Sequence, residues 1–128
     1  MAYQLTEADK RWNRFVRLAC KDWMTAELNA VQRAAFLCFW YDAEVNNGGH
    51  GQYFDIFPEL DPDEVAAALA TVAGEIAAAN FSRAVLEGEM DDYALADDVF
   101  YALEPSFGDR LMAYVEANRE SIFTVADD

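Results

Sequence analysis

The sequence predicts an all-α protein, a single compact domain of about six or seven helices around a buried central helix. Apolar residues recur at helical spacing in several segments, and capping residues precede those segments. No stretch alternates apolar and polar residues at useful length, as a strand would. With 128 residues, 54% of them hydrophobic, the chain can bury one sizeable hydrophobic core but is too short for two, so we expect residues 1–128 to form one domain.

The first helix is predicted to begin after Thr6, where Thr-Glu-Ala-Asp is close to a capping box. Its apolar residues fall three and four positions apart on one face: Trp12, Phe15, Val16, Ala19, Cys20 and Trp23. The opposite face is basic and holds Lys10, Arg11, Arg14, Arg17 and Lys21. We expect this basic face to contact solvent, or to pair with acidic residues of the same chain or of a second copy.

The central helix is predicted to start at Asn29, with Gln32 completing a second capping box. Residues 34–41 are apolar on nearly all sides, which indicates a buried helix. Asn46-Asn47-Gly48-Gly49 should end it, because Asn and Gly tolerate left-handed backbone. A short helix over about 51–57 should follow.

A further helix should start at Asp61 and Pro62, the strongest capping pattern in the chain. The apolar stripe holds Val65, Leu69, Val72 and Ile76, then shifts to Ala77, Phe81, Ala84 and Val85. This shift beside Gly74 predicts two helices joined there.

The segment 87–98 is dense in acid, and we expect a loop there. A short helix should follow over about 97–103. Ser106 is predicted to cap a last helix whose apolar face reaches Ile122.

The charge of the chain is uneven. Its net charge is −15, but residues 1–40 carry +2 and residues 41–128 carry −17, with 20 acidic and three basic side chains. An acidic surface repels phosphate, so we expect no direct binding of nucleic acid or of an anionic membrane. Such a surface is typical either of a soluble, self-repelling protein or of one that binds a basic partner.

No segment predicts export or membrane insertion. The N-terminus lacks the apolar core of a signal peptide, and the longest apolar run, 34–41, has eight residues. We therefore expect a cytoplasmic protein. Cys20 and Cys38 lie among apolar neighbours and are predicted to be buried free thiols, and their pattern fits no zinc site.

The single histidine, His50, suggests a general base that pairs with Glu44 or Asp42. No nucleophile stands in a recognisable setting and no oxyanion arrangement is visible, so a packing or hydrogen-bonding role is favoured over catalysis. We expect no catalytic residue and no cofactor.

Two other patterns fail as ligand sites. Asp61-x-Asp63 begins like a calcium loop, but Val65 and Ala66 stand where a further oxygen ligand and the glycine belong. The Asn-Asn-Gly-Gly break lacks the lysine of a phosphate loop, and no strand precedes it. We expect no bound metal.

The run Glu-Val-Asn-Asn-Gly-Gly-His-Gly-Gln-Tyr-Phe from Glu44 to Phe54 resembles the signature of a bacterial family of small acidic helical proteins, the DMP-nineteen type of DNA mimics. The positions that fit are Glu44, Asn47, Gly48, Gly49, Gln52, Tyr53 and Phe54, whereas His50 and Asp55 replace the usual Phe and Asn. The resemblance covers about 29–123. It implies an all-α fold, homodimers and the sequestering of a DNA-binding protein, with the motif itself serving as architecture.

The sequence thus predicts a non-enzymatic acidic binding protein, a DNA mimic that occupies the basic surface of a DNA-binding protein or nuclease. The carboxylates expected to contact the partner are those of Asp61, Asp63, Glu64, Glu87, Glu89, Asp91, Asp92, Asp97 and Asp98. Two alternatives stay open, an immunity-type antagonist of a toxin and an enzyme that uses Glu44 and His50. A continuous band of carboxylates would favour mimicry, and an even scatter would leave only a soluble acidic protein.

Overall fold

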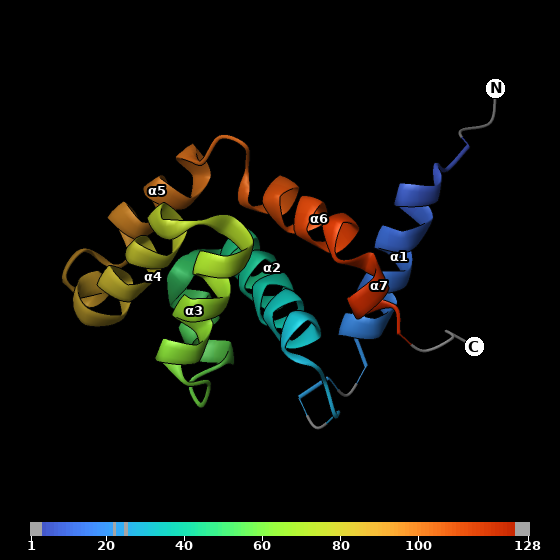
Figure 1. Cartoon of the computed structure of the whole chain (residues 1–128). Coiled ribbons are helices and arrows are strands. Elements are labelled where there is room, and N and C mark those ends of the chain that lie inside the picture. Colours follow the sequence, from blue (N-terminus) through green and yellow to red (C-terminus); the bar gives the residue numbers. More distant parts are fainter. Residues whose placement is uncertain (1–3, 22, 25, 125–128) are drawn as a thin grey trace.

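The computed structural model describes residues 4–21, 23–24 and 26–124. Over these residues the chain forms seven α-helices, one 3₁₀ turn and no strand, which confirms the all-α prediction (Figure 1). The elements are α1 (Glu7–Ala19), α2 (Ala30–Ile56), α3 (Pro62–Ala73), α4 (Glu75–Glu87), η1 (Gly88–Asp91), α5 (Ala94–Ala102), α6 (Phe107–Ala117) and α7 (Arg119–Ile122).

Both predicted capping boxes are present. The Thr6 hydroxyl accepts a hydrogen bond from the Asp9 backbone N–H, and the Asp9 carboxylate accepts one from the Thr6 N–H, both at 3.0 Å. Asn29 and Gln32 make the same reciprocal pair at the start of α2, at 2.8 and 3.0 Å. These bonds satisfy N–H groups that have no partner within the helix, so the start of each helix is encoded locally.

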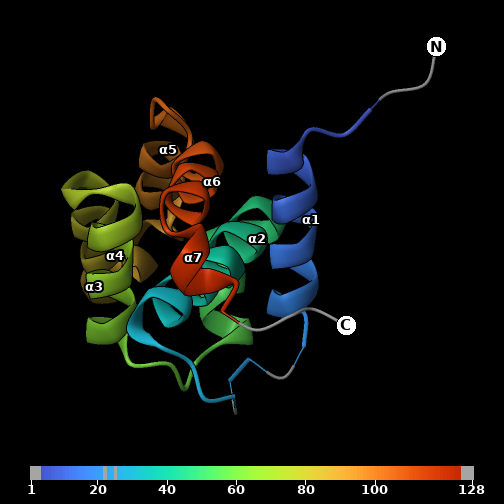
Figure 2. The same cartoon turned by 45° about the vertical axis from the view of Figure 1, so that its right-hand side comes forward.

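Helix α2 is the centre of the fold, as predicted. Both cartoon views place it between α1 on one side and the α3–α4 pair on the other (Figures 1 and 2). Tyr41, in the middle of α2, is only 1% exposed. Its ring meets five others edge-on, at centroid distances of 5.2–5.7 Å: His50, Tyr53, Phe81, Phe100 and Phe107. One side chain therefore joins α2, α4, α5 and α6 through favourable aromatic geometry.

The glycine pair bends α2 but does not end it. The helix kinks at Gly48 and Gly49 and continues to Ile56, close to the predicted end of the short helix. We expected the left-handed residue at Asn47 or Gly48, and this was wrong, because the residue with positive φ is Gly49 (φ 81°, ψ −179°). That backbone conformation is essentially restricted to glycine.

Gly74 separates α3 from α4, as the phase shift predicted. With φ at 103°, this one residue both ends α3 and begins α4. Arg110 of α6 holds the junction, since its guanidinium donates to the carbonyl of Ala73 at 2.7 Å.

The expected loop over 87–98 is instead mostly helical. The turn η1 follows α4 directly, Asp92 and Tyr93 adopt positive φ (54° and 64°), and α5 begins at Ala94, three residues before the predicted start. Tyr93 accounts for the turn: its N–H donates to the carbonyl of Gly88 at 2.7 Å, and its ring lies 5.5 Å from that of Phe54. Packing against α2 therefore overrides the local preference for a loop.

Three further expectations need correction. Cys38 is buried as predicted, but Cys20 is exposed because it caps the C-terminal end of α1. Ile76 lies on the surface, 66% exposed, because the turn at Gly74 rotates it away from the core. The last helix breaks at Asn118 into α6 and α7.

In the described part of the chain, no helix has the length and apolarity to cross a membrane.

Candidate functional site

The predicted partner-binding acids fall into three groups. Five are exposed and gather where α4, η1 and α5 meet, and we call these the acidic corner: Glu87, Glu89, Asp91, Asp92 and Asp98. Asp61 and Asp63 are exposed at the first turn of α3. Glu64 and Asp97 are partly buried, and their carboxylates bind other side chains.

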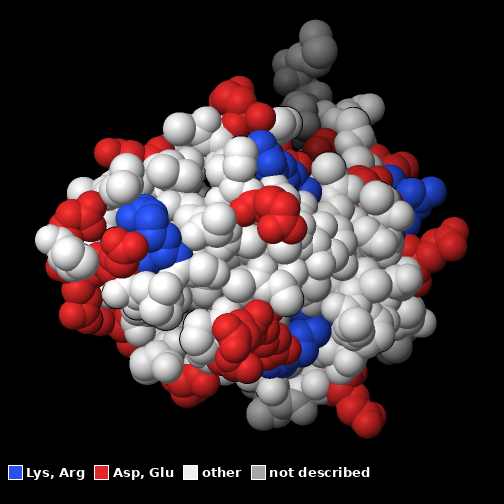
Figure 3. All heavy atoms as spheres, turned by 60° about the vertical axis from the view of Figure 1, so that its left-hand side comes forward, with Lys and Arg blue, Asp and Glu red and all other residues white. Residues whose placement is uncertain are grey.

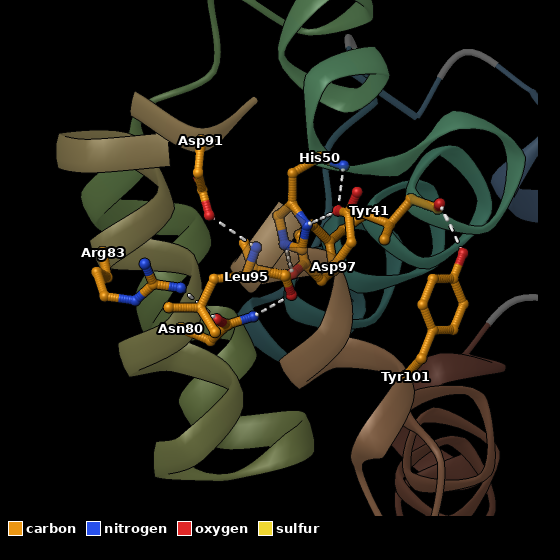
Figure 4. A network of polar contacts seen from close by, with 10 residues as sticks. Tyr41, His50, Asn80, Arg83, Asp91, Leu95, Asp97 and Tyr101 are labelled. Carbon is orange, nitrogen blue, oxygen red and sulfur yellow. Dashed lines mark hydrogen bonds and ion pairs between the residues drawn. The ribbon is translucent and has the colours of Figure 1, made fainter. Parts of the chain in front are cut away.

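The acidic corner is held by short-range and tertiary contacts. The Asp91 carboxylate accepts a hydrogen bond from the Leu95 N–H at 2.9 Å and so caps the start of α5. The buried Asn80 amide of α4 donates to the Ala96 carbonyl of α5 at 2.9 Å, as Figure 4 shows. The corner therefore presents its carboxylates from packed helices and not from a free loop.

The arginines among residues 41–128 bind uncharged groups. Arg110 donates to three backbone carbonyls, those of Ala73, Glu104 and Pro105. Arg83 donates to the Asn80 side chain, and Arg119 to the carbonyl of Glu116. These bonds support the fold.

The two clearest ion pairs link the N-terminal part of the chain to the acidic part. Arg33 holds Glu64 with two bonds at 2.6 and 3.0 Å, and Arg11 holds Glu116 with two at 2.8 and 2.7 Å. Each hydrogen-bonded guanidinium lowers the pKa of its carboxyl partner. Part of the basic side of α1 thus pairs within the chain, one of the outcomes that the sequence left open.

The carboxylates do not form one continuous band on the face drawn in Figure 3. They stand in separate groups with uncharged atoms between them, and the basic groups in view have acidic atoms beside them. A partner would therefore meet several acidic groups separated by neutral surface.

A network of three side chains, those of Tyr41, His50 and Asp97, joins the core to this surface. His50, directly after the kink in α2, is 0% exposed. Its Nδ1 lies 2.7 Å from Asp97 Oδ1 and its Nε2 lies 2.5 Å from the Tyr41 hydroxyl (Figure 4). The same Asp97 oxygen accepts the His50 backbone N–H at 2.9 Å. The partner of His50 is therefore Asp97 of α5, and not Glu44 or Asp42 as the sequence suggested.

Burial decides the protonation state of the network. Desolvation lowers the pKa of His50, although the hydrogen bond and the charge of Asp97 act in the opposite direction. A neutral ring with the proton on Nδ1 satisfies both contacts, because Nδ1–H donates to Asp97 and Nε2 accepts the Tyr41 hydroxyl. With the His50 ring fully buried, this arrangement links α5 to the kink.

One carboxyl with a raised pKa, that of Asp42, lies near the start of α6. Burial raises the pKa of Asp42 to about 6, while a hydrogen bond from Asn46 opposes the shift. Asp42 borders a small cavity of about 160 Å³ with Ser106 and Gly108.

Across the residues that the structure describes, no cluster of three or more His, Cys, Asp or Glu side chains is arranged to hold a metal ion.

Two larger hollows open on the surface. One, of about 590 Å³, lies between α2, α3 and α6, and its charged lining residues, Arg33 and Glu64, bind each other. The other, of about 280 Å³, lies between the end of α2, the start of α3 and the end of α4. Its lining is apolar or aromatic throughout and includes Phe57, Leu60, Pro62, Phe81 and Val85.

A model of a known protein family matches more than half of the chain. The model of the family described as DMP19-like protein matches residues 26–118. The chain belongs to the DMP19-like family. Comparisons with curated proteins and with solved structures returned no match.

In this DMP19-like protein the signature residues stabilise the kink. The Gln52 amide donates to the Glu44 carboxylate at 2.8 Å, which bridges the two halves of α2. A side chain at Gly49 would lie 2.5 Å from the Asp97 carboxylate. Tyr53 is buried, and Phe54 packs against the core. The conformation and small size of Gly49 thus let α5 approach the kink.

Two of the predicted partner-binding carboxylates are engaged within the chain, Glu64 by Arg33 and Asp97 by His50, and Asp97 is the one that points toward the core. It shares a helix face with Phe100, three residues later, and Phe100 is 5% exposed. In this DMP19-like chain that spacing was the available signal that the carboxylate points inward. The expected loop over 87–98 concealed it, because no helical face was assigned there.

Proposed function

We propose that this DMP19-like chain is a non-enzymatic protein-binding protein whose carboxylates engage the basic surface of a DNA-binding protein. The acidic corner carries the proposal, because it displays five exposed carboxylates within the twelve residues 87–98. A surface that grips phosphates with Lys and Arg is complementary to such a group. The family resemblance supports DNA as the ligand that these carboxylates imitate.

The internal use of arginine supports the same proposal. Arg83, Arg110 and Arg119 bind uncharged groups, and the ion pairs Arg33–Glu64 and Arg11–Glu116 lie outside the acidic corner, so the five carboxylates of the corner keep their charge. The resulting field would attract a basic partner over about 10 Å at moderate salt and would weaken at higher salt. The full burial of His50 supports the non-enzymatic part of the proposal.

A matched pair of charge variants tests the proposal. The first neutralises four residues of the acidic corner, Glu87→Gln, Glu89→Gln, Asp92→Asn and Asp98→Asn. The control neutralises four exposed acids elsewhere, Glu27→Gln, Glu75→Gln, Glu104→Gln and Glu120→Gln. Both sets change the net charge equally, and Asn tolerates the positive φ of position 92. Asp91 is kept because its carboxylate caps α5.

Each protein is immobilised and incubated with extract of the source cell at 50 mM salt, then washed with 25-base-pair duplex DNA or with 0.5 M salt. We expect the wild type and the control set to retain a basic protein that the duplex displaces, and the corner set to lose it. Retained protein that salt removes but DNA does not would overturn the DNA-mimic part. Equal loss by both sets would show that net charge alone, and not the acidic corner, is recognised.

A further inference from the structure

The 280 Å³ hollow beside Phe57 stands out because its lining is apolar or aromatic while exposed acids neighbour the lining residues in the chain. Phe57 belongs to the end of α2, Leu60 to the connection, Pro62 to the start of α3, and Phe81 and Val85 to α4. We call it the α2–α4 pocket. Tyr53 also lines it, but no charged side chain does.

Acidic residues alternate with the lining residues along the chain. Asp55 precedes Ile56 and Phe57, Glu59 stands between Pro58 and Leu60, and Asp61 and Asp63 stand on either side of Pro62. All four of these acids are exposed: Asp55, Glu59, Asp61 and Asp63. At the α4 end, Val85 is followed two residues later by Glu87, the first residue of the acidic corner.

Basic side chains are missing from this part of the sequence. Residues 34–82 contain no Lys and no Arg. The nearest, Arg83, donates to Asn80, which lies on the face of α4 that meets α5. The lining residues up to Phe81, and the acids Asp55, Glu59, Asp61 and Asp63 among them, thus lie on a stretch of chain without Lys or Arg.

We propose that the α2–α4 pocket receives one apolar side chain from a basic segment of the partner, such as a Leu, Met or Phe flanked by Lys or Arg. This inference rests on the proposed function, because it adds an apolar anchor to the charge-based contact. The pocket volume lies just below the roughly 300–1,000 Å³ of small-molecule sites, which fits a single large side chain. Buried apolar anchors beside a charged rim are the usual source of affinity in protein interfaces.

The anchor also separates this mode of binding from pure imitation of DNA. Phosphate groups offer charge and hydrogen-bond acceptors, and a protein that reads them needs no apolar contact at that point. A partner that inserts an apolar side chain into the α2–α4 pocket would distinguish this protein from DNA, whereas a partner held by carboxylates alone would not.

A pair of phenylalanine variants tests the anchor. Val85→Phe fills the rim of the pocket without a change in charge, at a position that is 41% exposed. The matched control is Ile76→Phe, on the same helix, 66% exposed and outside the pocket lining. Both sites are on the surface, so we expect both variants to fold, and circular dichroism melting checks that they do.

The probe is a displayed library of random twelve-residue peptides, selected on the wild-type full chain at 150 mM salt. We expect enriched peptides that place Leu, Met or Phe next to Lys or Arg. The consensus peptide and a copy with alanine at the apolar position are then compared by fluorescence anisotropy. We expect the anchored peptide to bind about tenfold or more tightly than its alanine copy. Val85→Phe should remove that advantage, and Ile76→Phe should keep it.

The outcomes separate this inference from the proposed function. Enriched peptides that are basic but lack an apolar position would overturn the anchor and leave the charge-based function standing. Failure to enrich basic peptides at all would count against both. If sedimentation shows a wild-type dimer that Val85→Phe converts to a monomer, the pocket is filled by a second copy, and the anchor is overturned.

Discussion

Replacement of Gly49 by alanine should be among the most damaging small changes in this protein. The residue has φ 81° and ψ −179°, a region that is essentially restricted to glycine, and holding another residue there costs about 1–3 kcal/mol. The new Cβ would also lie 2.5 Å from Asp97 Oδ2. The other oxygen of Asp97, Oδ1, accepts hydrogen bonds from the backbone N–H and the ring of His50. Because the Asp97 side chain is short, displacing Oδ2 should weaken at least one of these hydrogen bonds, at a cost of about 1 kcal/mol in stability.

We therefore expect Gly49→Ala to lower the free energy of unfolding by about 2–4 kcal/mol, with an unchanged dependence on denaturant. Urea titration followed by circular dichroism measures this. Gly108→Ala is the control, because a Cβ there would meet Asp42 at an ordinary 3.6 Å within the first turn of α6. It should be neutral or stabilising by up to about 1 kcal/mol.

A double-mutant cycle isolates the part that comes from Asp97. In an Asp97→Ala background, Gly49→Ala should cost about 1 kcal/mol less than in the wild type, because the displaced carboxylate is already absent. A Gly49→Ala loss below about 1 kcal/mol, or a loss equal in both backgrounds, would refute the reasoning that the kink and α5 are coupled through this contact.

Three further predictions concern single contacts. Asp42→Asn should raise the free energy of unfolding at pH 7 by about 1–2 kcal/mol. The pKa of Asp42 in the folded protein, about 6, lies above the usual 3.8. The protonated carboxyl therefore stabilises the fold fully below pH 4, and this stabilisation is lost as the pH rises through 6. The difference in urea stability between wild type and variant should shrink toward pH 4, and a constant difference would contradict the shifted pKa. Tyr41→Phe should cost about 1–3 kcal/mol by leaving buried His50 Nε2 without its donor. Thermal melts of both variants measure this. The control Tyr101→Phe, at a 58% exposed residue, should cost less than about 1 kcal/mol. Equal losses in the two variants would contradict the role of the network. A cycle of Arg33→Gln and Glu64→Gln should give a coupling of about 0.5–1 kcal/mol that falls in 1 M salt, and a coupling that salt leaves unchanged would contradict a partly exposed ion pair.

Features that rest on neighbouring residues were predictable from the sequence. The capping boxes at Thr6 and Asn29 and the junction at Gly74 depend on hydrogen bonds or backbone angles within a few residues, and all three are where the sequence placed them. The central position of α2 also followed, because apolar residues on all sides of a helix can only be covered by several neighbours.

Features that rest on distant contacts were not predictable in this way. The turn at Asp92 and Tyr93 exists because the Tyr93 ring packs on α2, and no local rule places a tyrosine at positive φ. Cys20 continues the apolar stripe of α1 yet is exposed, because the helix ends there. For the candidate site, the exposure of the acidic corner matched the expectation, while the inward direction of Asp97 required a helix face that the sequence reading had assigned to a loop.

The tie between Asp97 and the kink bears on how firmly a partner would be held. Asp98 and the start of α5 are fixed relative to the aromatic core, because the preceding residue, Asp97, is hydrogen-bonded to buried His50. A disordered acidic tail of the same charge would lose backbone conformational entropy on association, at about 1–2 kcal/mol for each residue fixed. Here much of that ordering of the backbone occurs when the chain folds. Complexes with a rigid acidic surface of this kind should therefore form with a smaller entropy loss than those of an unstructured acidic peptide.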